Sequence, residues 1–237
     1  MGCIVNMKIN SEFNQRVVVH SSQTEWLESP MPGVYRRPLD RVGAEVARAT
    51  TIVKYDPNSK FSPHVHTGGE EFIVLEGVFQ DEHGDYPVGS YIRNPPQSSH
   101  TPGSDEGCVI FVKLWQFDPL DRHNIRIKAD EMSAVQDKNQ HSISIVHLYK
   151  DNFEDVSIQQ WSANSEITIA ATDGLEVLVL EGSFCDGDDT LVQHSWLRLP
   201  MGESLIANTG HQGARVWVKQ NHLRNVDDQI QRLNHAA

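Results

Sequence analysis

A short segment of the chain carries residue types that can bind a metal ion. The segment SPHVHTGGEEFIVLEGVF (Ser62–Phe79) places His64 and His66 two positions apart, followed by Gly68-Gly69 and Glu70. In a β-strand, residues i and i+2 point to the same face, so both imidazoles can approach one point. The glycine pair permits a sharp turn, after which the glutamate can return to that point.

A third histidine, His100, can complete this set. It follows GSYIRNPPQSSH, in which Gly89 and the rigid Pro95-Pro96 are expected to shape the turn that returns the chain to the site. The predicted metal ligands are His64, His66, Glu70 and His100. Three imidazoles and one carboxylate suit Zn²⁺, Fe²⁺, Mn²⁺ and Ni²⁺ alike, so the residues leave the metal open. The other nine histidines are interpreted as surface or hydrogen-bonded core residues, and we assign no catalytic residue.

The elements that must position these ligands are predicted to be strands. Short runs rich in β-branched and aromatic residues alternate with turn residues, which is typical of a sandwich or barrel. The runs are Thr50–Tyr55, Phe72–Phe79, Cys108–Phe117, Ile143–Tyr149, Ile167–Thr172, Leu175–Phe184 and Ala214–Lys219. Helical periodicity is weak, and Asn225–Leu233 is the best short candidate.

An internal repeat sets the number of domains. A shift of 105 residues aligns positions 71–100 with 176–205 at eleven identities, where unrelated sequences give about two. The same shift replaces all four predicted ligands together, by Ile169, Ala171, Leu175 and Leu205. We therefore expect a metal-binding first copy and a metal-free second copy with a mainly apolar interior. The second copy is interpreted as a structural partner, with an apolar ligand pocket as the alternative.

The spacing of the predicted ligands also resembles a known superfamily. The pattern is His64-x-His66-x3-Glu70-x6-Gly77, followed by Gly89-x5-Pro95-x-Gln97-x2-His100. It resembles the two cupin motifs, which carry a metal inside a small β-barrel. Asn58 and Gln97 stand where the two motifs usually have glycine. Asn tolerates a positive φ, so the first change is mild, and the second concerns only a turn.

Within the cupins, residues 26–115 resemble the sensory domain of the ChrR anti-sigma factor and its relatives, which include acetylacetone-cleaving dioxygenases. The second half resembles this family only through the repeat. Residues at the matching positions bind zinc in the ChrR family, so the resemblance implies zinc at the four predicted ligands, with Glu71 as the alternative carboxylate. ChrR also has a helical domain with a His-x3-Cys-x2-Cys site that binds the sigma factor. The chain has no Cys-x-x-Cys motif, so sigma-factor binding is not expected.

Two functions follow as hypotheses. The first is a metal-binding, ChrR-like bicupin with a sensory or binding role and a small-molecule ligand in the N-terminal barrel. The second is an Fe²⁺-dependent dioxygenase that cleaves a β-diketone. Whether the chain is an enzyme stays open. The basic segment Val34–Arg41 is interpreted as solvated or paired with carboxylates.

The expected fold is an all-β double cupin, made of two tandem jelly-roll barrels. Its expected divisions are an N-terminal cupin at 1–120, a linker at 121–139, a degenerate cupin at 140–222 and a tail at 223–237. Because the net charge is −12, nucleic acid and anionic membrane surfaces are not expected as partners. Three scattered cysteines and no apolar run of membrane-spanning length favour a cytoplasmic protein. The cupin resemblance also allows a homodimer, because cupins commonly pair through sheet edges.

Overall fold

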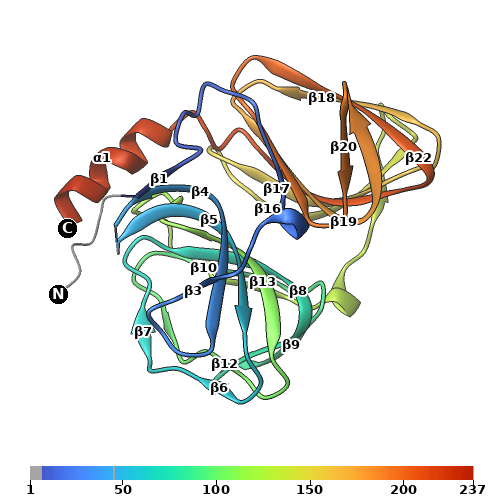
Figure 1. Ribbon diagram of the computed structural model, residues 1–237. Coiled ribbons are helices and arrows are strands. Elements are labelled where there is room, and N and C mark those ends of the chain that lie inside the picture. The colour runs from blue at the N-terminus through green and yellow to red at the C-terminus, as the bar shows by residue number, and fades with distance from the viewer. Residues whose placement is uncertain (1–6, 45, 237) are drawn as a thin grey trace. The chain divides into compact units, whose positions relative to one another are not determined.

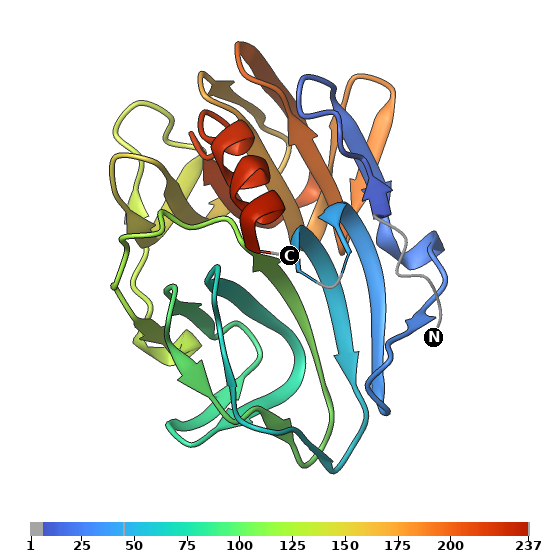
Figure 2. The ribbon, with the colours of Figure 1, turned by 90° about the vertical axis from the view of Figure 1, so that its left-hand side faces the viewer.

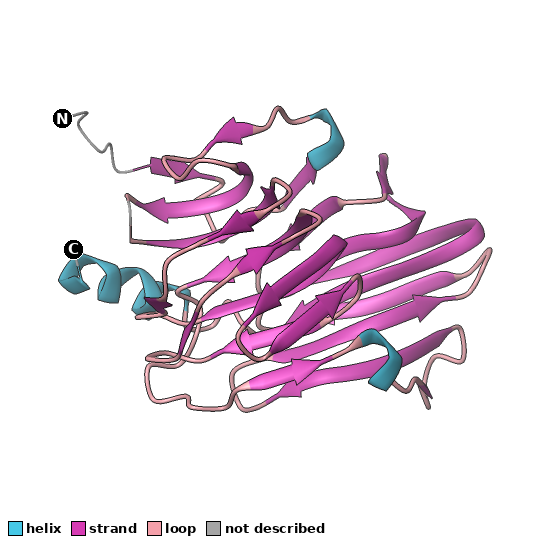
Figure 3. Ribbon diagram, turned by 90° about the horizontal axis from the view of Figure 1, so that it is seen from below, coloured by secondary structure: helices cyan, strands magenta, loops and turns pink. Residues whose placement is uncertain are grey.

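The structure is a computed structural model that describes residues 7–44 and 46–236. Most of these residues form strands, and the same ranges contain one α-helix, α1 (Val226–Ala236), and two short 3₁₀ turns, η1 (Ser21–Gln23) and η2 (Ala129–Glu131) (Figures 1 and 3). All seven predicted strands and the predicted helix are present. Most ends differ by a few residues, but the strand predicted at Ala214–Lys219 begins at Glu203. None of the helices in the described ranges is both long and apolar enough to cross a membrane.

The chain forms two compact units, which we call the first and second barrels. The described part of the first barrel comprises residues 7–11, 25–132 without residue 45, and 227–236. Its strands are β1 (Met7–Ile9), β3 (Leu27–Glu28), β4 (Val34–Gly43), β5 (Ala47–Tyr55), β6 (Ser59–Lys60), β7 (His64–Val65), β8 (Glu70–Asp81), β9 (Gly84–Pro87), β10 (Tyr91–Asn94), β11 (Ser99–His100), β12 (Gly103–Ser104), β13 (Cys108–Leu114) and β14 (Ile125–Ile127).

Antiparallel pairing orders the main sheet of the first barrel as β1-β4-β5-β13-β8-β10-β14. Figure 2 shows β4, β5 and β13 side by side, coloured from blue to green. Alternate residues of these strands face a common interior, where Val53, Phe72, Ile110 and Val112 belong to the apolar core. A separate two-stranded sheet pairs β7 with β11.

The second barrel comprises residues 12–24 and 133–226. Its strands are β2 (Val17–His20), β15 (Val135–Gln136), β16 (Ile143–Lys150), β17 (Asp155–Trp161), β18 (Glu166–Ala171), β19 (Leu175–Asp186), β20 (Asp189–Val192), β21 (Ser195–Leu199) and β22 (Glu203–Gln220). The sheet order is β15-β16-β17-β22-β19-β21-β2, and β18 pairs with β22. Each barrel is therefore an antiparallel β structure built around its own buried core.

The two barrels share a backbone feature that explains part of the repeat. Gly77 and its counterpart Gly182 have φ of 68° and 72°, a region that favours glycine. A Cβ added to these glycines would lie 2.1 Å and 2.2 Å, respectively, from the carbonyl oxygens of Gly107 and Gly213. The repeated Glu-Gly pair thus preserves a close approach between neighbouring strands.

The units are not continuous in sequence. Strand β2, near the N-terminus, pairs with β21 and so extends the sheet of the second barrel. Helix α1 belongs instead to the first barrel, where Gln229 accepts a hydrogen bond from Arg48 Nε at 2.8 Å and donates one to the carbonyl oxygen of Gln116 at 3.1 Å.

The expected boundaries 1–120, 121–139, 140–222 and 223–237 treat each half as one continuous segment. In the structure, residues 12–24 belong to the second barrel and residues 227–236 to the first. The expected linker also contributes β14 to the edge of the first sheet, where it pairs with β10. Sequence periodicity does not reveal these differences, because each depends on contacts between residues far apart in the chain.

Candidate metal centre

Three histidines from two short strands and a turn converge in the first barrel. His64 lies on β7, opposite His100 on β11, and His66 follows β7. Their ring centroids are 4.6–5.0 Å apart, and each ring offers one nitrogen in a group whose members lie within 4.8 Å of one another. The three histidines predicted from the sequence are therefore brought together.

The turn that presents His66 depends on unusual backbone positions. The His66 N–H donates to the carbonyl oxygen of Ser98 at 2.9 Å, and the Gln97 N–H donates to the carbonyl oxygen of His66 at 2.8 Å. Gln97 has a φ of 72° and Asn58 a φ of 62°. Both residues that replace cupin glycines thus adopt the left-handed conformation that glycine would supply.

The glycine pair after His66 also has a steric role. Gly69 has a φ of 80°, and a Cβ on Gly68 would lie 2.1 Å from the Trp115 ring. The turn can therefore pass close to this ring and lead directly into Glu70, the first residue of β8. Local backbone geometry thus explains the spacing of the His66 and Glu70 side chains.

Glu70 is the carboxylate that reaches the histidines. Its Oε2 lies 3.5 Å from Nε2 of His66 and 3.5 Å from Nε2 of His100. It also accepts a hydrogen bond of 3.4 Å from Asn94 Nδ2 on β10. The alternative carboxylate, Glu71, is buried and accepts a 2.5 Å hydrogen bond from the hydroxyl of Tyr91. Since neighbouring strand residues point to opposite faces, Glu70 and Glu71 have separate roles.

Two contacts orient the outer nitrogens of the histidines. His64 Nδ1 lies 3.3 Å from the carbonyl oxygen of Ser62, which can only accept a hydrogen bond, so Nδ1 is the donor and Nε2 keeps its lone pair. His100 Nδ1 lies 3.5 Å from Oδ2 of Asp81, whose side chain is fully buried. Carboxylates and backbone carbonyls commonly orient metal-binding histidines in this way.

The protonation states favour metal binding. Burial lowers the pKa of His66; the Glu70 carboxylate opposes this shift, while His100 and His64 reinforce it. Burial alone raises the pKa of Asp81, but its contact with His100 and the N–H of His83 bring the net pKa below the usual value. These shifts favour a neutral imidazole at His66 and an ionised carboxylate at Asp81.

The donor set fits a divalent cation. Nε2 of His66 is buried and has no hydrogen-bond partner within residues 7–44 and 46–236. Leaving such an atom unsatisfied costs about 1–3 kcal/mol, a cost that coordination would remove. Imidazole nitrogens and a carboxylate oxygen are suitable ligands for Zn²⁺ and for Fe²⁺.

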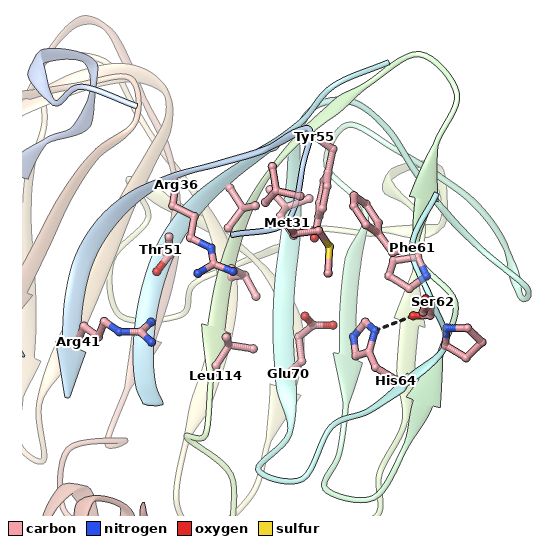
Figure 4. Close-up of a pocket in the computed structure, with 16 residues that line it drawn as sticks. Met31, Arg36, Arg41, Thr51, Tyr55, Phe61, Ser62, His64, Glu70 and Leu114 are labelled. Atoms are coloured by element: carbon pink, nitrogen blue, oxygen red, sulfur yellow. Dashed lines mark hydrogen bonds between the residues drawn. The ribbon is translucent and has the colours of Figure 1, made fainter. Parts of the chain in front are cut away.

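A cavity of about 360 Å³ lies beside this group, inside the first barrel. His64 and Glu70 form part of its wall, and Figure 4 shows both side chains directed toward it. The remaining wall is mainly apolar. It consists of Met31, Val34, Val53, Tyr55, Phe61, Pro63, Pro102, Ile110, Val112 and Leu114, together with Ser62, Thr51, Arg36 and Arg41.

Three residues at or beside the candidate site were not predicted from the sequence. The segment Val34–Arg41 was interpreted as solvated or paired with carboxylates. Arg36 is exposed, in agreement with this interpretation, but Arg36 and Arg41 also line the cavity. The alternation of Val34 and Arg36 on one strand face was an available signal, but Arg41 required knowledge of a bulge. Asp81 was not predicted either, although the 105-residue repeat aligns it with Asp186.

The second-barrel counterparts of the four ligands are buried and apolar. Ile169, Ala171, Leu175 and Leu205 belong to its core, and their exposed fractions are 8%, 0%, 0% and 0%. The expectation of an apolar interior is therefore confirmed. That this barrel is metal-free stays a prediction.

One family model matches part of the chain, mostly within the first barrel. Residues 14–118, less than half of the chain, match the family model of the ChrR cupin-like domain. No curated protein sequence matches the chain.

Several solved structures share the fold across both barrels. A provisionally named dioxygenase from Nostoc punctiforme has 14% identity and a TM-score of 0.70, and the match covers 89% of this chain and 84% of that one. The YlbA protein of E. coli has 14% identity and a TM-score of 0.68, with 92% and 96% covered. An oxalate decarboxylase of Lactobacillus farciminis, in a formate complex, has 9% identity and a TM-score of 0.60, with 88% and 86% covered. The chain thus has the predicted all-β double-cupin fold.

Proposed function

We propose that the ChrR-like cupin domain at residues 14–118 binds one divalent metal ion and presents it to a small molecule. The proposed metal ligands are His64, His66, Glu70 and His100. The observation that carries this proposal is that His64 and Glu70 belong both to the ligand group and to the wall of the cavity. A molecule in the cavity would therefore lie beside the ion.

This arrangement favours a ligand-binding site over a purely structural one. Four protein ligands alone would close a tetrahedral zinc site, so ligand binding requires a further coordination position. The cavity beside His64 and Glu70 offers the space for it. His64 is exposed, and the cavity volume falls at the lower end of the range for small-molecule sites. Zinc is the metal implied by the ChrR resemblance, and Fe²⁺, Mn²⁺ and Ni²⁺ suit the same donors.

The bound ion would act as a Lewis acid on the oxygen atoms of the small molecule. The chain would supply binding and orientation. Apolar side chains such as Val112 and Leu114 would exclude water from the carbon skeleton, and Asp81 would hold the ring of His100. Binding without chemistry would correspond to the sensory role of ChrR-like cupins.

Dioxygen-dependent cleavage of a β-diketone is the second candidate. The observation that favours it is the space beside the ligand group, because a bidentate substrate and dioxygen both need open positions. Arg93, Tyr91 and Glu82, which adjoin the site in sequence, do not line the cavity. Arg93 instead forms a buried ion pair with Asp121. An oxygenase would therefore have to use the cavity residues Tyr55, Arg36 and Arg41.

Cobalt substitution and oxygen uptake test both candidates. The protein is loaded with Co²⁺, and acetylacetone is added while the visible d–d absorption is followed. A spectral change at one Co²⁺ per chain would support ligand access to the metal, and an unchanged spectrum at saturating ligand would contradict it. The Fe²⁺-loaded protein is then tested for acetylacetone-dependent oxygen uptake. Uptake would favour the oxygenase, whereas binding without uptake would favour the sensory role.

A further inference from the structure

We infer that the small molecule bound in the first barrel is an organic anion whose carboxylate is held by Arg36 and Arg41. This inference rests on the proposed metal-dependent function and specifies its ligand class. The molecule would direct its metal-binding oxygen atoms toward His64 and Glu70 and its carboxylate toward the two guanidinium groups. Its carbon skeleton would lie against the apolar wall between them.

Both arginines come from β4, and a bulge brings them to the same cavity. Residues five positions apart on a regular strand point to opposite faces. The pairing of β4 with β5 shifts between Pro38 and Asp40, so one extra residue separates Arg36 from Arg41. Figure 4 shows both guanidinium groups extending from this strand into the space that Glu70 and His64 face.

Neither guanidinium forms an ion pair with a described residue. Arg41 donates a hydrogen bond to the carbonyl oxygen of Ala44, and no carboxylate oxygen within residues 7–44 and 46–236 lies within ion-pair distance of Arg36 or Arg41. Burial lowers the pKa of Arg41, and the nearby positive charge of Arg36 lowers it further. Arg36 is exposed and Arg41 half-buried, so a bound anion would replace water at these groups and relieve their repulsion.

The negative charge of the whole chain contrasts with the two positive charges of Arg36 and Arg41. The chain has 20 Lys and Arg residues against 32 Asp and Glu residues, for a net charge of −12. Its overall field therefore repels anions, and an anionic ligand needs a specific cationic contact inside the cavity. Arginine suits this task because its planar guanidinium group binds a carboxylate through two parallel hydrogen bonds.

The rest of the wall limits the size and polarity of the ligand. Val53, Ile110, Val112 and Leu114 present only carbon atoms to a space of about 360 Å³. The Tyr55 hydroxyl adds one hydrogen-bonding group, and burial, with Glu70 and Cys108 nearby, raises its pKa, so it stays protonated. We therefore expect a small, amphipathic organic acid that also chelates the metal.

Two matched ligands test this inference. Acetylacetone and acetopyruvate are both β-diketones, but acetopyruvate has a carboxylate in place of one terminal methyl group. Their dissociation constants are measured by calorimetry on the full chain loaded with Zn²⁺, which avoids redox chemistry. We expect acetopyruvate to bind at least about tenfold more tightly, because a charge-assisted Arg–carboxylate contact contributes this much. Arg36→Gln and Arg41→Gln should each reduce this preference while retaining one Zn²⁺ per chain.

Arg37→Gln is the matched control on the same strand. Arg37 lies over the Trp26 ring, 4.2 Å from its centroid, and does not line the cavity. This variant should keep the preference for acetopyruvate. Equal affinity for the two ligands, or a preference unchanged in both Arg36→Gln and Arg41→Gln, would overturn the inference and leave the metal site intact. Failure of the wild-type chain to hold Zn²⁺ would instead overturn the proposed function and, with it, this inference.

Discussion

The two barrels share a backbone fold but differ in the side chains of their interiors. In the first barrel, Glu71 accepts a hydrogen bond from Tyr91 at 2.5 Å. In the second, the equivalent Glu176 accepts one from the indole nitrogen of Trp196 at 3.2 Å. The interiors diverge at the positions of the predicted ligands. Three histidines and a glutamate converge in one barrel, whereas isoleucine, alanine and two leucines are buried in the other.

This difference shows that the residues needed for folding are distinct from the predicted metal ligands. The second barrel packs its core without any of the four ligands, so the fold does not require them. Burying Leu175 and Leu205 there removes apolar surface from water, at about 25 cal/mol per Å². The first barrel has a 360 Å³ cavity and a buried unsatisfied nitrogen on His66. Metal binding would offset the free-energy cost of burying these polar groups in the first barrel.

Metal removal should produce the largest difference between the barrels. Free metal at about 1,000 times its Kd stabilises a protein by about 4 kcal/mol, so a chelator should lower the protection of the first barrel by that amount. Hydrogen exchange would measure this at the amides of β7 and β11, with β18 as the internal control. An equal loss of protection in both barrels would contradict a metal site confined to the first.

A substitution of the shared glycine should affect both barrels alike. In Gly77→Ala and Gly182→Ala, the new Cβ would lie close to a backbone carbonyl oxygen, in a left-handed conformation. Each variant should lose about 3 kcal/mol of unfolding free energy in denaturant titrations. A loss in only one of them would show that the repeated glycine has different roles in the two copies.

The buried ion pair between Asp121 and Arg93 should make the stability of the first barrel sensitive to low pH. Burial alone raises the pKa of Asp121, but the N–H of His123 and the charge of Arg93 bring it below the usual value. The folded state therefore binds this proton less readily than the unfolded state. The resulting stability is present above the unfolded pKa, about 4, and is lost as pH falls through the lower folded pKa. Asp121→Asn should remove about 2 kcal/mol at pH 7 and flatten this pH dependence. Unchanged stability at pH 7, or an unchanged slope below pH 4, would count against this ion pair.

Substitutions of Asp81 and Asp186 give a matched comparison of metal affinity. They occupy equivalent repeat positions, but Asp81 contacts the ring of His100 and Asp186 pairs with Arg16 at 2.9 Å. Asp81→Asn should weaken metal binding by about tenfold, because partners of metal-binding histidines commonly have effects of this size. Asp186→Asn should leave metal affinity unchanged. Competition against a chromophoric chelator measures both, and equal effects would refute a special role for Asp81.

Much of the fold could be predicted from the sequence because it depends on local patterns. Strand-forming runs located the main strands, and the 105-residue repeat revealed two copies. The alternation of His64 and His66, followed by a glycine turn, predicted a convergence that the structure reproduces.

Features that depend on distant contacts were not predicted. Residues 12–24 belong to the second barrel, where β2 pairs with β21. Residues 227–236 belong to the first barrel, where helix α1 contacts Gln116. Arg41 reaches the cavity because of a bulge after Pro38, and no sequence pattern specifies that bulge. These residues acquire their roles from tertiary structure.

Metal stoichiometry tests the central claim most directly. The chain is purified without a metal-affinity column, loaded with Zn²⁺, desalted and analysed by elemental mass spectrometry, beside His100→Ala and its second-barrel counterpart Leu205→Ala. We predict about one metal ion per chain in the wild type and in Leu205→Ala, and little or none in His100→Ala. A full complement of metal in His100→Ala, or two ions per wild-type chain, would contradict a single metal site built from the ligands of the first barrel.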